Sequence, residues 1–155
     1  MKRTKRRMTV CTVLLICNLV FIWGNSLLPA EVSGQISGTL KALLDGVFTP
    51  GEAVPSGGDG LMRKCAHFAE FGALGLLLGW LFGMLGKKRL PAFALSLAAA
   101  CIDETIQAFV PGRSPGIRDV CIDSCGAAAG MLLLVLGHAY WKRRFTRKNS
   151  GGNET

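Results

Sequence analysis

The signatures of several common sites are missing from this sequence. It contains no Cys-x-x-Cys pair of the kind that binds structural zinc, no Walker-type phosphate loop and no Rossmann glycine motif. These absences argue against the zinc-finger, P-loop and dinucleotide-binding classes. There is also no evident internal repeat, which argues against a repeat architecture.

Charged residues are scarce as well. They make up 18% of the 155 residues, half of the residues are hydrophobic, and the mean hydropathy is +0.36. This balance is unusual for a soluble domain and indicates a membrane protein. The net charge of +8 would also fit a nucleic-acid-binding protein. However, the basic residues flank apolar runs, so we predict no nucleic-acid partner and expect contact with membrane lipids.

Four apolar runs approach the roughly 20 residues that cross a bilayer. They predict an all-α membrane protein with one four-helix domain, residues 10–141, whose spans are residues 10–28, 67–86, 90–110 and 120–141. A basic N-terminal tail (1–9) and a basic, polar C-terminal tail (142–155) flank this domain. The first run follows "KRTKRR" and also has the form of a cleaved signal peptide, which is the alternative for that segment.

The basic residues predict the orientation of the four spans. Thirteen of the 18 Lys and Arg residues fall on one side of this topology, in the two tails and in the turn "KKR". By the positive-inside rule, both termini are cytoplasmic. The loop of residues 29–66 then lies outside, and its segment "VSGQISGTLKALLDGVF" has the apolar spacing of a short amphipathic helix.

The six cysteines lie within or at the ends of the apolar runs. We interpret them as small packing residues, because a free cysteine behaves as a buried hydrophobe. A disulfide among those near the outer face is the alternative, and sequence alone leaves its pairing open. The six are Cys11, Cys17, Cys65, Cys101, Cys121 and Cys125.

Polar residues gather at one depth of the predicted bundle. At about 1.5 Å per helical residue, they fall in the outer leaflet on the second, third and fourth spans. Because intramembrane ionisable groups are costly, they indicate a functional pocket that faces outward. The predicted binding residues are Arg63, His67, Glu70, Asp103, Glu104, Gln107, Arg113, Asp119 and Asp123.

Glycines at four-residue spacing mark close helix contacts in two of these spans. The segments "GLLLGWLFG" and "GAAAG" have the small-xxx-small pattern that lets two helices approach. The predicted packing positions are Gly75, Gly79, Gly83, Gly126 and Gly130.

Three segments together resemble the VanZ-like family of small integral membrane proteins. They are "FIWGNSLLP", "RKCAHFAEFGALG" and "DETIQAFVPGRSPGIRDVCIDSCGAAAG". The positions that match the motifs are His67, Glu70, Glu104, Gln107, Arg113, Asp119 and Asp123. The resemblance implies a protein of the bacterial cell envelope with a role in resistance to teicoplanin, a glycopeptide antibiotic.

We expect the pocket to bind or influence a lipid or a cell-wall component, such as a lipid-linked precursor or a glycopeptide-related ligand. Arg113, Arg118 and His67 would hold its phosphate or carboxylate. The main alternative is a membrane-embedded hydrolase or transferase that acts on a lipid-linked substrate, with His67, Glu70 and Glu104 as catalytic candidates. A small proton-coupled carrier and a purely structural protein are further alternatives.

We predict no cofactor and no bound metal. A metal site would combine His67 and Glu70 with the acids of the third and fourth spans, and one histidine is a sparse set for zinc. The oligomeric state is left open.

Overall fold

The computed structural model describes residues 2–36, 38–39 and 59–150, and the described part contains helices and turns but no β-strand. Four long helices dominate it: α1 (Lys2–Ser26), α3 (Asp59–Met84), α4 (Leu90–Ala108) and α5 (Ile117–Ser150). Residues 30–36 and 38–39 are also helical. They cover the start of the predicted amphipathic helix, and the rest of that segment lies outside the described residues.

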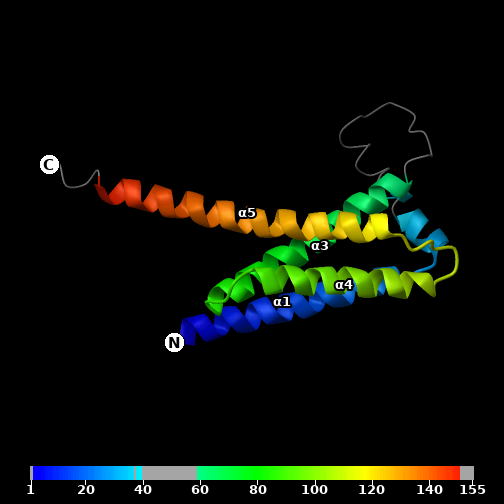
Figure 1. The fold of residues 1–155 in the computed structure, drawn as a ribbon, viewed down its shortest axis with the longest axis horizontal. Helices are drawn as coiled ribbons and strands as arrows, with labels where there is room; N and C mark the ends of the chain where they lie inside the picture. Colours follow the sequence, from blue (N-terminus) through cyan, green and yellow to red (C-terminus); the bar gives the residue numbers. More distant parts are fainter. Residues whose placement is uncertain (1, 37, 40–58, 151–155) are drawn as a thin grey trace, which may run out of the picture.

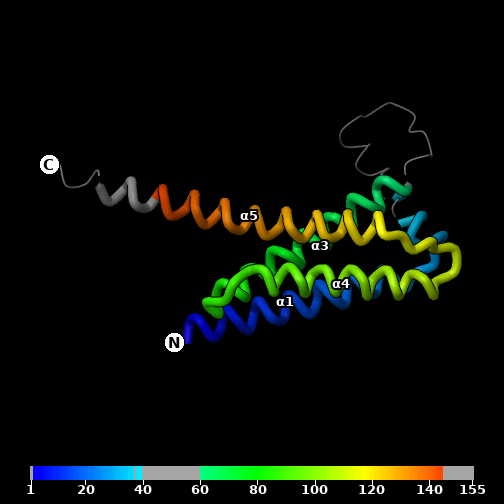
Figure 2. Tube along the Cα trace, viewed as in Figure 1, coloured from blue at the N-terminus to red at the C-terminus, as the bar shows by residue number. Residues whose placement is uncertain are grey.

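The four long helices run back and forth along one bundle axis (Figure 1). The start of α1 and the C-terminal part of α5 lie at one end of the bundle. The opposite end gathers the C-terminus of α1, the N-terminus of α3 and the turn between α4 and α5 (Figure 2). Residues far apart in the sequence therefore meet at this second end, which we call the outer end after the orientation that the basic residues predict.

The bundle exposes apolar side chains around its circumference. Val13, Ile16, Val20, Leu132 and Leu133 are among those about half or more exposed. Such a surface is unfavourable in water and suits a lipid environment. Within the described residues, three helices are long and apolar enough to cross a membrane: Lys2–Ser26, Gly60–Met84 and Ile117–Arg144. The described part of the chain is all-helical, and its apolar helices indicate a membrane protein.

The number of candidate spans corrects the prediction of four. The segment predicted as the third span forms α4, but this helix is not among the three candidates. Asp103, Glu104 and Gln107 in its C-terminal third reduce its apolar character. All three of these side chains are buried against other helices. Helix α4 therefore hides its polar face within the protein.

The turn between α3 and α4 is closed by backbone hydrogen bonds. Gly86 has a φ of +66°, and its amide and that of Lys87 donate to the carbonyls of Gly83 and Phe82. This is a Schellman motif, in which a glycine adopts the left-handed conformation after the last helical turn. Pro91 in the first turn of α4 then starts the next helix.

Helices α3 and α5 are in backbone contact at three of the predicted packing glycines. A Cβ atom at Gly75, Gly126 or Gly130 would come within 3.0 Å of the backbone of the facing helix. At Gly79 the neighbours are side chains of α5, at 3.3 Å or more. Gly83 has nothing within 4 Å of its Cβ position, so the close contact ends before this residue.

The remaining core is small and apolar, and it joins all four long helices. Its buried members are Ile22, Phe71, Leu74, Leu78, Ala92, Ala99, Ala100 and Met131. All six cysteines are free, and of these Cys11 is buried while the other five face outward. The structure thus contains none of the disulfides considered as the alternative, and most of the cysteines lie on the bundle surface.

Candidate functional site

The turn between α4 and α5 directs an arginine into the outer end of the bundle. The Arg113 amide donates to the Val110 carbonyl at 3.2 Å, and Gly112, with a φ of +74°, occupies the third position. Pro111 and Gly112 are the residues that a type II turn prefers at its centre. A Cβ at Gly112 would also lie 3.1 Å from Ala30, so the turn packs against the start of the outer loop.

Arg113 closes the C-terminal end of α1. Its Nε donates to the Leu28 carbonyl at 3.2 Å and its Nη2 to the Asn25 carbonyl at 3.0 Å. The last carbonyls of a helix lack intrahelical partners. The Asn25 carbonyl also accepts from the Leu28 amide at 3.2 Å, so Arg113 adds a second bond there and gives the Leu28 carbonyl a partner. Burial lowers the pKa of Arg113 below its ordinary value, but an arginine remains charged in proteins.

A chain of hydrogen bonds continues from Arg113 to a buried carboxylate. Arg113 Nη1 donates to Gln107 Oε1 at 3.2 Å, and Gln107 Nε2 donates to Asp103 Oδ2 at 2.7 Å. Ser26 Oγ donates to Asp103 Oδ1 at 2.6 Å. Since arginine can only donate, the Gln107 amide has one orientation in this chain. The fully buried Asp103 is therefore held by partners from α1 and α4.

His67 lies between two carboxylates. Its Nδ1 is 3.9 Å from Glu70 Oε2 and 3.9 Å from Asp103 Oδ2. Asn25 Nδ2 donates to the other oxygen of Glu70 at 3.0 Å. Both His67 Nδ1 and Glu70 Oε2 are buried and without a hydrogen-bond partner. This arrangement leaves one imidazole nitrogen and one carboxylate oxygen directed into the polar cluster.

Two further carboxylates have a free oxygen in the same cluster. Glu104 Oε2 accepts from the Gly116 amide at 2.8 Å, while its Oε1 is buried and unpartnered. Asp123 on α5 is 1% exposed, and no hydrogen bond reaches its Oδ1. Because buried polar atoms normally have partners, these free oxygens suggest that something besides the chain interacts with them.

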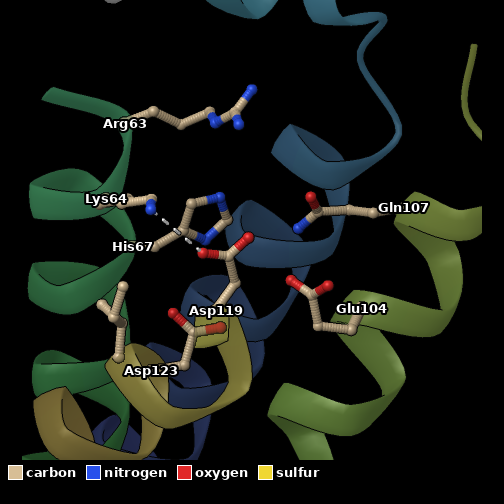
Figure 3. Close-up of a pocket in the computed structure, with 8 residues that line it drawn as sticks. Arg63, Lys64, His67, Glu104, Gln107, Asp119 and Asp123 are labelled. Atoms are coloured by element: carbon tan, nitrogen blue, oxygen red, sulfur yellow. Dashed lines mark ion pairs between the residues drawn. The ribbon is translucent and has the colours of Figure 1, made fainter. Parts of the chain in front are cut away.

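Basic side chains form the rim of the cluster (Figure 3). Lys64 Nζ lies 3.9 Å from Asp119 Oδ1, and both side chains are partly exposed. Arg63 is half-buried and makes no side-chain hydrogen bond within the described part of the chain. Arg118 is exposed and does not line the pockets described below. The cation best placed to meet an incoming anion is therefore Arg63.

Two pockets meet at Arg63 and His67. The first has a volume of about 10 Å³ and is also lined by Glu104, Asp119 and Asp123. The second has a volume of about 370 Å³. Its other lining residues are mostly apolar and come from α1, the following loop, α3 and the turn between α4 and α5: Phe21, Asn25, Leu28, Ser33, Ile36, Met62, Ala66, Glu70 and Arg113. A small polar pocket thus adjoins a larger, mainly apolar one.

The structure brings all nine predicted binding residues to the outer end of the bundle. Arg113 was predicted to hold the anionic group of a ligand, but its donors are used on Gln107 and on the carbonyls of Asn25 and Leu28. Sequence reasoning missed Asn25, Ser26 and Lys64 as members of this region. The signal for Asn25 and Ser26 was the "NS" pair at the end of the first apolar run.

Comparison with known proteins identifies a family. No curated protein and no solved structure matches the chain. The family model described as VanZ/LLP1 matches residues 8–138, which is most of the chain and includes every residue of the outer cluster. The resemblance found in the sequence is thereby confirmed, and the chain belongs to the VanZ/LLP1 family.

Proposed function

We propose that this protein binds the anionic head group of a lipid-linked component of the bacterial cell envelope. In this proposal α4 crosses the membrane together with the three candidate spans, both termini are cytoplasmic, and the outer end of the bundle faces the extracytoplasmic side. The positive-inside rule supports this orientation, since the basic tails and the turn "KKR" lie at the opposite end of the bundle.

The observation that carries the proposal is the shared wall of the two pockets. Arg63 and His67 line both the small polar pocket and the 370 Å³ pocket. Phe21, Ile36 and Met62 give the larger pocket apolar walls. An amphipathic ligand would place its apolar chain there and its charged head beside Arg63. Binding sites commonly combine such an apolar wall with a few polar groups.

The free donors of Arg63 support an anionic head group. A guanidinium group binds phosphate or carboxylate through two parallel hydrogen bonds. Arg113, by contrast, uses its donors on Asn25, Leu28 and Gln107. We therefore assign ligand binding to Arg63 and His67, and we assign Arg113 to positioning the helices around them.

Binding of a polyprenyl phosphate to the purified protein tests the proposal. Native mass spectrometry in detergent would compare this lipid with the uncharged polyprenol of the same chain length. We expect the phosphate to bind at least tenfold more tightly, and Arg63→Gln to remove this preference. Arg118→Gln is the matched control, because Arg118 is exposed and lies outside both pockets. Equal binding of the phosphate and the alcohol would refute the proposal.

We further propose that binding at this site reduces susceptibility to teicoplanin. Membership of the VanZ/LLP1 family supports this role. Expression in a susceptible host should raise the inhibitory concentration of teicoplanin, and Arg63→Gln should cancel the increase at equal protein level in the membrane. An unchanged inhibitory concentration on expression of the intact protein would refute the role in resistance and leave lipid binding to its own test.

A second candidate function is hydrolysis or group transfer on the same class of lipid. The observation that favours it is His67, whose Nδ1 lies 3.9 Å from each of two carboxylates and has no hydrogen bond. An imidazole in such a position is a candidate general acid or base. Release of phosphate from a polyprenyl diphosphate should then disappear in His67→Gln and persist in His138→Gln. No release by the intact protein counts against an enzyme.

A further inference from the structure

We propose that His67, Asp103 and Asp123 bind one divalent transition-metal cation at the centre of the outer polar cluster. These residues come from α3, α4 and α5, and each offers one ligand atom. The three atoms lie within 4.8 Å of one another. The ion would therefore connect three helices at a single point. The sequence-based prediction of no metal is thereby revised, because spacing along the chain does not show which side chains of three helices meet.

The state of Asp123 points to a ligand that the chain itself does not supply. Asp123 is 1% exposed, and its Oδ1 has no hydrogen-bond partner. It borders the polar pocket together with His67 and Glu104, whose Oε1 is also unpartnered. The volume of this pocket is about 10 Å³. A single water-sized sphere needs roughly this space, so the pocket suits an ion and is too small for a head group.

The charges around the pocket also call for a cation. Five carboxylates lie in the cluster or at its rim, on Glu70, Asp103, Glu104, Asp119 and Asp123, and the three cations beside them are Arg63, Lys64 and Arg113. With every carboxylate ionised, two negative charges remain without a partner. Buried carboxylates relieve such an excess either by taking up protons or by binding a cation, and one divalent cation would neutralise it. A bound cation would also remove the electrostatic repulsion between these carboxylates and an anionic head group.

The hydrogen bonds to Asp103 are those expected around a metal ligand. Ser26 and Gln107 each donate to one of its oxygens, at 2.6 and 2.7 Å. A carboxylate oxygen has two lone pairs, so Oδ2 can accept from Gln107 and still bind a cation. Partners of this kind fix the orientation of a ligand, and removing them typically costs about 10–100-fold in metal affinity. Arg113 in turn donates to Gln107 at 3.2 Å and so helps to fix the position of that side chain.

The ligand set indicates the class of metal. Imidazole favours zinc and neighbouring transition metals, while carboxylates also suit manganese. Around a tetrahedral ion with bonds of about 2.1 Å, ligand atoms are roughly 3.4 Å apart. The observed limit of 4.8 Å means that the ligands close by little more than 1 Å when the ion binds. Three protein ligands leave a fourth position open for water or for an anionic group of a bound molecule.

Metal binding is tested with the ion alone, without any lipid. The full-length protein, purified in detergent with its affinity tag removed, is treated with a chelator and then dialysed against Zn²⁺ or Mn²⁺. We expect one ion per chain by elemental analysis, with Zn²⁺ bound more tightly than Mn²⁺. His67→Ala and Asp123→Asn should each lower the affinity more than about 100-fold. His138→Ala is the matched control, because His138 is exposed at the other end of the bundle.

Thermal unfolding separates a lost site from a damaged fold. Without metal, Asp123→Asn should unfold at the same or a higher temperature than the intact protein, because it removes a like charge from the cluster. With Zn²⁺, the intact protein should be stabilised and the variant should not. The proposal is overturned if the intact protein binds less than one ion per chain. It is equally overturned if Zn²⁺ binding survives in both His67→Ala and Asp123→Asn. Because no lipid is present, these results are independent of the proposed function.

Discussion

The contact between α3 and α5 allows a sharp test of the fold through a single methyl group. Gly130 of α5 lies against Gly72 of α3, and a Cβ at position 130 would be 2.8 Å from the Gly72 carbonyl carbon and nearer still to its oxygen. It would also be 3.1 Å from the amide nitrogen of Leu76. These are backbone atoms, which cannot rotate away as a side chain does. Gly130→Ala therefore forces the two helices apart.

The magnitude follows from this geometry. Overpacking a core typically costs about 1–3 kcal/mol, and rigid surroundings favour the upper value. We therefore expect Gly130→Ala to lower the free energy of unfolding by about 3 kcal/mol. For a chain of this size, that corresponds to a fall in unfolding temperature of roughly 6–12 °C. Tryptophan fluorescence during heating in detergent measures this change, since Trp80 lies on α3.

Two glycines on the same pair of helices provide matched controls. A Cβ at Gly137 of α5 or at Gly83 of α3 would have nothing within 4 Å. Alanine at either position should leave the free energy of unfolding unchanged or raise it slightly, because alanine has a higher helix propensity than glycine. Equal unfolding temperatures for Gly130→Ala and Gly137→Ala would refute the close contact of α3 and α5.

Three further predictions concern the outer end of the bundle. Arg113→Lys should lower stability by at least about 2 kcal/mol, because an ammonium group cannot replace three forked hydrogen bonds, and unchanged thermal unfolding would contradict this role. Ser26→Ala should cost about 1–3 kcal/mol by removing the 2.6 Å hydrogen bond to Asp103, and a substitution of no effect would show that this bond is dispensable. A variant whose sole cysteine is Cys65 should react with a membrane-impermeant maleimide on intact cells. A sole cysteine at position 144, in place of Arg144, should react only after permeabilisation, and the reverse pattern would refute the proposed orientation.

For each polar residue of the site, the sequence could predict its depth along the span and the face of the helix on which it lies. The rise of a helix and its angular repeat are nearly constant, so the position of a polar residue along a span gives its level. His67, Glu104 and Asp123 were assigned to one level on three helices by this reasoning, and they line one pocket in the structure. The family was predicted from the same motifs, and the family model confirms it.

The partners of these residues were harder to predict. Arg113 was expected to hold the anionic group of a ligand, but the carbonyls of Asn25 and Leu28, at and just beyond the end of α1, take two of its donors. Nothing in the spacing of residues indicates which helix end will lie beside a turn 85 or more positions away. Asn25 and Ser26 were missed for a related reason. A polar pair at the end of an apolar run normally marks the membrane boundary, and its burial depends on neighbours from other parts of the chain.

The glycine positions show what cannot be predicted from the face of a helix on which residues lie. Gly75, Gly79 and Gly83 share a stripe on α3, yet the close contact ends between the second and the third. Helices that cross at an angle separate with distance from their crossing point. Figure 1 shows α3 and α5 diverging toward the end of the bundle that holds the termini. The spacing of small residues thus predicts a contact face but not how far along the helices the contact extends.

The polar face of α4 has a consequence for the order in which the protein enters its membrane. A helix that carries Asp103, Glu104 and Gln107 gains little by moving alone from the translocon into lipid, because acidic residues within a helix oppose its insertion. Its partners on α1 are synthesised earlier, and those on α5 are synthesised later. We therefore expect α4 to remain near the translocon until α5 emerges, and the two helices to be released as a hairpin. In the proposed four-span topology, a chain truncated after residue 116 would then leave α4 on the cytoplasmic side or exposed to degradation, although every residue of that helix is present.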